Sequence, residues 1–109
     1  MALTPENLYG SLNGTTPVDL VAAPAASEQF IIKSLVIYNK DTASVTVTIS
    51  LTNSGTAYEL VKTTITTLST YTWSDVLVLD ATTESITAVM SGAPSTTQPT
   101  FTSHYVSQT

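Results

Sequence analysis

The feature that most constrains the fold of this chain is an alternation of side chains, SVTVTISLT, at residues 44–52. Its odd positions hold Val, Val, Ile and Leu, and its even positions hold only Ser or Thr. A period of two is typical of a β-strand with one apolar face and one polar face. Because the apolar face must pack against another layer, the alternation predicts a strand in a protein of packed β-sheets.

Other segments with strand character follow along the chain, separated by turns rich in Gly, Pro, Asn and Asp. They are residues 18–23, 29–39, 57–65, 71–79, 85–91 and 100–108. Short strands at intervals of about 8 to 12 residues are typical of antiparallel sandwiches and small barrels. We therefore expect an all-β fold: an antiparallel β-sandwich or a small jelly-roll-like barrel of roughly seven to eight short strands with an extended N-terminal arm.

The segment QFIIKSLVIYN at residues 29–39 is apolar on both faces of the expected strand. Strict alternation places Phe30, Ile32, Val36 and Tyr38 on one face and Ile31, Leu35 and Ile37 on the other. Such a strand is buried on both faces or lies at a contact between subunits.

The chain divides by composition into an N-terminal arm, residues 1–17, and a β-sandwich domain, residues 18–109. The arm contains two Pro and two Gly residues, and its larger apolar side chains follow no strand or helix period. They are Leu3, Leu8, Tyr9 and Leu12. An irregular segment of this kind is a poor anchor for its own core, so we expect these four residues to act in assembly by docking on a partner.

Charge and composition exclude several classes of protein. Only 10% of the residues are charged, the net charge is −5, and the chain has three Lys and no Arg. Binding to nucleic acid or to an anionic membrane requires clustered basic side chains, so we expect neither partner. The chain has no Cys, which excludes a thiolate zinc site and disulfide bonds. The N-terminus lacks the basic start and apolar run of a secretion signal, which predicts synthesis in a cytoplasm.

The residue types that carry chemistry form no recognisable motif. His104 is the single histidine, and Asp75, Asp80 and Glu84 lie close in sequence without the ligand spacing of a calcium loop. A small hydrolase using Asp75, Glu84 or His104 is the least favoured interpretation. We expect no enzymatic activity, no catalytic residues, no metal and no cofactor.

Two aromatic residues on one strand, Tyr71 and Trp73, admit two interpretations. Exposed, they would form a stacking platform for a sugar. However, the same strand face continues into Leu77 and Leu79, which favours a place in the core.

The order of the segments from residue 28 to residue 92 resembles small structural proteins in the virions of tailed bacteriophages. An Ile-rich strand ending in Asn (31–39) precedes the Val/Thr strand (44–52), a Trp-containing strand leads into a Leu-rich one (71–79), and a strand with Ser-Ile-Thr-Ala (85–89) follows a turn.

This resemblance implies a structural protein of the phage particle: a capsid decoration (cement) protein, a head fibre or a tail-associated module. It implies a homo-oligomer, with a trimer favoured, whose partners are other virion proteins such as the major capsid protein or tail proteins. The expected function is therefore that of a non-enzymatic capsid decoration protein, made in the host cytoplasm and located in the virion. The alternative is a carbohydrate- or host-receptor-binding module of a tail fibre or head fibre that would bind its ligand through Tyr71 and Trp73.

Overall fold

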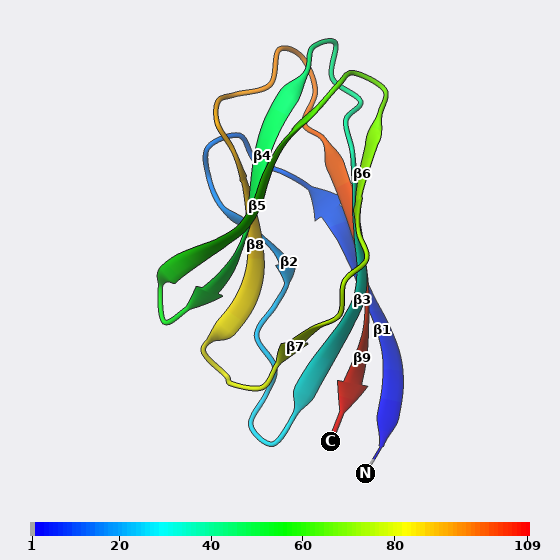
Figure 1. The fold of residues 1–109 in the computed structure, drawn as a ribbon, viewed down its shortest axis with the longest axis vertical. Coiled ribbons are helices and arrows are strands. Elements are labelled where there is room, and N and C mark those ends of the chain that lie inside the picture. The colour runs from blue at the N-terminus through cyan, green and yellow to red at the C-terminus, as the bar shows by residue number, and fades with distance from the viewer. Residues whose placement is uncertain (1) are drawn as a thin grey trace.

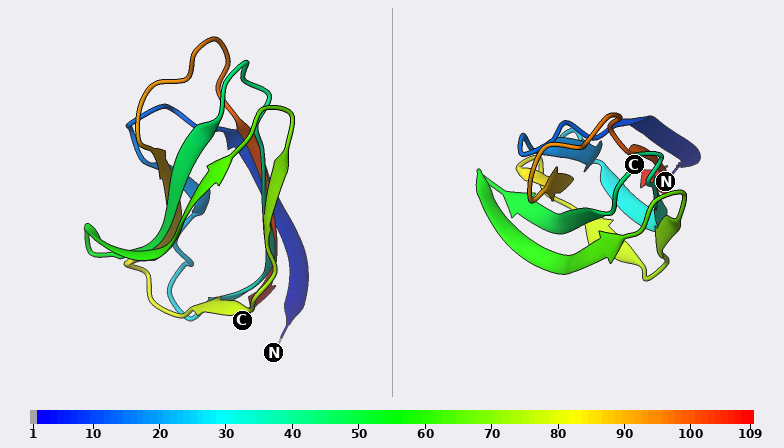
Figure 2. Two further views of the ribbon diagram at one scale, coloured as in Figure 1. Left: turned by 45° about the horizontal axis from the view of Figure 1, so that its top comes forward. Right: turned by 90° about the horizontal axis from the view of Figure 1, so that it is seen from above.

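The computed structural model describes residues 2–109 and confirms an all-β antiparallel sandwich of two sheets. Figure 1 shows the two layers side by side, with β1, β9, β3 and β6 in one and β2, β8, β4 and β5 in the other. The view from above in Figure 2 shows the interior between them. No helix suited to crossing a bilayer occurs among the described residues.

The first sheet has five strands in the order β1-β9-β3-β6, and β7 pairs with β3 beside this path. Its strands are β1 (Leu3–Ser11), β9 (Thr100–Gln108), β3 (Gln29–Tyr38), β6 (Thr70–Trp73) and β7 (Leu77–Leu79). The second sheet has four strands in the order β2-β8-β4-β5. They are β2 (Val18–Val21), β8 (Glu84–Met90), β4 (Val45–Asn53) and β5 (Thr56–Ile65).

The alternation predicted for β4 holds over residues 45–49, and beyond them Ser50 is also buried and Leu51 is half-buried. Val45, Val47 and Ile49 are buried between the sheets, and the facing sheet contributes buried apolar side chains from β3. These facing side chains are Phe30, Ile32, Leu35 and Ile37. The removal of this apolar surface from water is the main force that holds the two layers together.

The hydroxyl face of β4 points away from the core and bonds to its neighbours on both sides. The Thr46 hydroxyl lies 3.0 Å from the hydroxyl of Thr64 on β5. The Thr52 hydroxyl lies 3.0 Å from that of Thr87 on β8. Cross-strand hydroxyl pairs of this kind stabilise a sheet by satisfying polar groups within one face.

Residues 2–109 form nine strands where roughly seven to eight were expected, for two reasons. The segment 71–79 was expected to be one strand, but it divides into β6 and β7, which pair with opposite ends of β3. Between them, the indole Nε1–H of Trp73 donates to the carbonyl of Asp75 over 2.9 Å, so the chain turns locally. The other additional strand is β1, in the segment expected to be an irregular arm.

The expected faces of β3 are corrected by a bulge. The register between β3 and β9 shifts between Ile32 and Ser34. The extra residue turns Leu35 and Ile37 back toward the core and leaves Val36 and Ile31 on the outer face. Strict alternation does not hold here, because a bulge reverses the face of the sheet on which the following side chains lie. The sequence contains no pattern that marks the bulge.

Candidate interaction surface

The strand β1 lies at an open edge of the five-stranded sheet. It pairs along its whole length with β9, from Leu3 opposite Gln108 to Ser11 opposite Thr100. Eight of its nine residues are exposed, and only Leu8 is half-buried. Figure 1 shows this strand as the outermost ribbon of its layer. An edge strand of this kind presents unpaired backbone groups along its free side.

The expectation of an irregular arm is therefore wrong for residues 3–11. The sequence did not predict this strand, because few of its inward positions carry apolar side chains. Residues opposite each other in an antiparallel pair share a face, so the buried residues of β9 identify the inward positions of β1. These positions are Thr4, Glu6, Leu8 and Gly10. Backbone pairing with β9 forms the strand, and its own hydrophobic pattern does not.

The four residues expected to act in assembly divide into two pairs. Leu3 and Tyr9 are 62% and 74% exposed on the outer face, where they are available to a partner. Leu8 packs against the core, and Leu12 is part of it with 2% exposure. The Leu12 amide also donates to the carbonyl of Pro99 over 2.9 Å. The view that this segment does not anchor its own core is therefore wrong at Leu12.

Tyr71 and Trp73 face inward. They lie opposite Ile37 and Leu35, which are both buried, and they pack against the core as half-buried side chains. The prediction of a core position for Trp73 is confirmed in its direction, although the indole is not fully covered. A role for these two rings in stacking on a sugar stays a prediction.

We expect Trp73→Ala to lower the free energy of unfolding by about 2 to 3 kcal/mol, because a half-buried indole loses part of the contacts of a fully buried one. Chemical denaturation monitored by circular dichroism measures this change. The neighbouring Thr72→Ala, on the outward face of the same strand, should change it by less than about 0.5 kcal/mol. Equal stabilities of the two variants would contradict the inward placement of Trp73.

Two polar residues after β3, Asn39 and Asp41, are buried at 0% and 1% exposure. The Asn39 side-chain amide donates to the carbonyls of Ala43 and Ile65 over 3.0 and 2.9 Å. Its Oδ1 accepts the amide N–H of Asp41 over 2.9 Å. Asn39 thereby links the β3–β4 turn to the end of β5.

The Asp41 carboxylate extends this network to a distant loop. It accepts backbone N–H groups from Ser95, Thr96 and Thr97 at 2.8 to 3.2 Å, and the N–H of Thr42 at 2.8 Å. Burial alone would raise the pKa of this carboxyl, but these amide hydrogen bonds outweigh burial and hold the pKa well below its usual range. Asp41 is thus a structural acceptor that fixes the longest internal loop. The sequence predicted only a turn at this position, because hydrogen bonds between residues 54 positions apart leave no local pattern.

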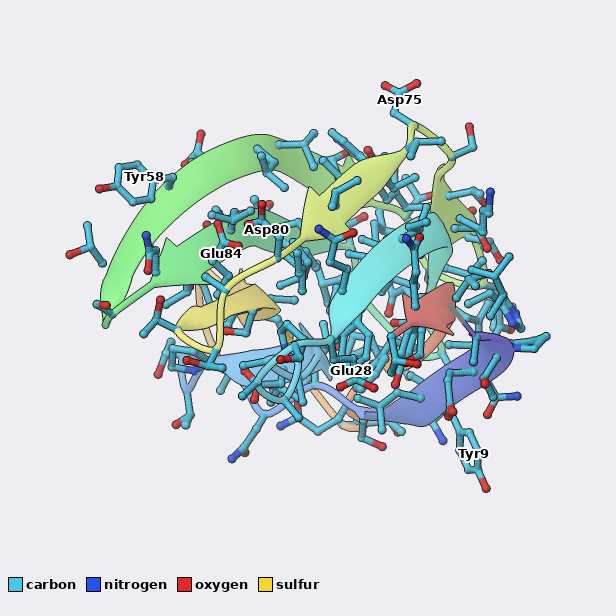
Figure 3. The ribbon with its side chains drawn as sticks, turned by 90° about the horizontal axis from the view of Figure 1, so that it is seen from below. Tyr9, Glu28, Tyr58, Asp75, Asp80 and Glu84 are labelled. Carbon is cyan, nitrogen blue, oxygen red and sulfur yellow. The ribbon has the colours of Figure 1, made fainter. Side chains whose placement is uncertain are left out.

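The carboxylates at the opposite end of the sandwich cap turns (Figure 3). Glu84 accepts the amide N–H groups of Asp80 and Ala81 at 3.0 and 3.1 Å. Glu28 accepts the hydroxyl of Ser107 at 2.6 Å, and this bond, together with the Ala25 amide, lowers the pKa of Glu28. A shallow pocket of about 300 Å³ opens beside Glu28 and Asp80.

These groups do not assemble a recognisable centre. Within residues 2–109, no three His, Asp or Glu side chains are grouped so as to hold a metal ion. His104 lies on β9 in register with Asn7 and Ser34, and Asp75 lies in the exposed β6–β7 connection. The absence of a metal, a cofactor and an activity stays a prediction.

Comparisons with known proteins support the fold and no more. No protein-family model and no curated protein sequence matches the chain. A solved structure similar in fold is a protein of the Bacillus endospore appendages, described as a novel family of disulfide-linked pili. The match has a TM-score of 0.56 at 14% identity and covers 99% of this chain and 87% of that one. At this identity the likeness shows a shared sandwich architecture alone, and the phage resemblance stays a prediction.

Proposed function

We propose that this protein is a non-enzymatic structural subunit that acts by assembling into a larger particle. Within that class, the sequence resemblance favours a capsid decoration protein of a tailed phage that works as a homo-oligomer, with a trimer favoured. Its partners would be other virion proteins, and its location would be the virion. The pilus protein with a similar fold supports the broader statement, because there a sandwich of this kind belongs to an assembled appendage.

The observation that carries the proposal is the exposure of β1. A long edge strand with free backbone groups and two exposed apolar side chains, Leu3 and Tyr9, can receive a strand or a flat surface from a partner. Figure 3 shows Tyr9 projecting away from the body of the sandwich beside this strand. Each such contact is modest, but a regular particle repeats it many times and gains avidity. Because the chain has no Cys, copies of it would be held by non-covalent contacts and not by disulfides.

The test is reconstitution on particles that lack the protein. Virions are prepared from a phage whose copy of this gene is deleted, and the purified protein is added and sedimented with them. We expect the protein to enter the particle pellet, and we expect the double variant Leu3→Ser, Tyr9→Ser to bind at least about 10-fold more weakly.

The matched control is Tyr58→Ser. Tyr58 is 57% exposed on β5 of the other sheet, and Figure 3 shows it on the side of the molecule away from Tyr9. This variant should sediment with particles as the unmodified protein does. Protein that stays in the supernatant would overturn the proposal. Full binding by the double variant would show that β1 does not form the contact with the particle.

A further inference from the structure

The outer face of the five-stranded sheet carries a row of apolar side chains that crosses four strands. Pro5 on β1 lies opposite Val106 on β9, which lies opposite Ile31 on β3, which lies opposite Val78 on β7. Because opposed residues share a face, all four side chains point outward on the same side of the sheet. We call them the apolar row.

Further apolar side chains lie on the same face. Leu3 flanks the row on β1, whereas a polar row of Asn7, His104 and Ser34 separates it from Tyr9, Val36 and Tyr38. Val78 is 48% exposed, and Ile31, Val36 and Val106 are half-buried. Exposed apolar side chains gathered on one face are typical of an interaction site.

The distribution of charge separates this face from the rest of the molecule. Of the eight acidic residues, none occupies an outward position on β1, β9, β3, β6 or β7. Lys33, at the bulge of β3, and His104, at an outward position of β9, are the basic side chains on these strands. The outer face of the four-stranded sheet differs, because it carries hydroxyl pairs together with Asp19, Glu59 and Lys62.

We propose that the outer face of the five-stranded sheet binds a second copy of this chain, with the apolar row at the centre of the contact. Two copies of a protein with a net charge of −5 repel each other wherever acidic side chains meet. On this face two copies meet without acidic groups and bury apolar surface. The electrostatic repulsion that opposes self-association is therefore smallest here, and the free energy gained from burial is largest. A partner of opposite charge would instead be attracted to the acidic parts of the molecule.

The geometry suits a symmetric contact between two sheets. The molecule extends 45 × 25 × 19 Å, so its broad side has room for the roughly 800 Å² per partner of a standard interface. Two such faces pack as layers about 10 Å apart, and a two-fold axis makes each the complement of the other. This contact therefore predicts a dimer in place of the trimer that the resemblance favours. The inference names the self-contact of the proposed assembly function and rests on that function for its biological role.

The first test is the mass of the purified protein in solution, measured by sedimentation equilibrium over a range of concentrations. We expect reversible association, which Val106→Glu and Val78→Glu each weaken at least about 10-fold, because they place like charges at the contact. Val78 is already exposed, so its variant keeps the fold. The control Thr48→Glu, on the outer face of the other sheet, should leave the association unchanged.

A second test locates the contact directly. Because the chain has no Cys, Val106→Cys introduces a single site for a spin label, and Thr48→Cys introduces one on the opposite sheet. Pulsed electron resonance should give a shorter distance between copies for the label at residue 106 than for that at residue 48. The opposite order would overturn the inference, as would a monomer at every concentration or association that neither glutamate variant weakens.

These outcomes can be distinguished from those of the particle assay. Protein that binds virions but remains monomeric overturns this inference and the homo-oligomer, and leaves the proposed role as a structural subunit of the particle in place. Protein that associates with itself through this face but does not bind virions supports this inference and overturns the proposed function.

Discussion

Asp41→Ala should lower the melting temperature by about 10 to 20 °C at pH 7. The carboxylate accepts four backbone N–H groups, three of them from the loop of residues 92–99, and the variant leaves these donors without partners. Thermal unfolding followed by circular dichroism measures the change. Asp75→Ala removes an exposed carboxylate of the β6–β7 connection, and its melting temperature should stay within about 3 °C of the unmodified protein.

The same carboxylate makes part of the stability depend on pH in a defined direction. Burial would raise the pKa of Asp41, but the amide hydrogen bonds prevail, and the folded-state pKa lies below the unfolded value of about 4. The ionised carboxylate therefore stabilises the fold above that value, and its contribution is lost as the pH falls through the folded-state pKa. The gap in melting temperature between the unmodified protein and Asp41→Asn should be constant above about pH 5 and narrow below about pH 4. A gap that widens on acidification would contradict this assignment.

Leu12→Ala should lower the free energy of unfolding by about 2 to 5 kcal/mol, because it opens a cavity at a side chain that is 2% exposed. Leu3→Ala is the matched control, since the same truncation at a leucine that is 62% exposed should cost less than about 0.5 kcal/mol. Urea denaturation measures both values.

Truncation of the N-terminal segment separates the contribution of Leu12 to stability from that of β1. Removing residues 1–17 takes away Leu12 and the Gly14 carbonyl that accepts the Met90 amide at 2.9 Å, so the domain should be strongly destabilised. Removing residues 1–9 keeps both groups and should cost much less. Equal losses in the two truncations would show that β1, and not Leu12, carries the stability of this segment.

Much of the fold follows from local patterns in the sequence. The alternation in residues 44–52 and the regular spacing of turns predicted an antiparallel sandwich, because a period of two specifies a strand whose apolar face needs a facing layer. The inward position of Trp73 was also predictable, since Leu77 and Leu79 continue the same pattern.

The tertiary structure alone decided how the terminal segment and the polar residues are used. The segment of residues 3–11 became a strand because β9 offered it a backbone edge, although its inward side chains carry almost no hydrophobic signal. Asn39 and Asp41 became buried because loops from distant parts of the chain meet around them. Hydrophobic periodicity is a local property that a sequence displays. Strand partners, bulges and long-range hydrogen bonds are set by which segments meet in space, and so only the folded chain determined them.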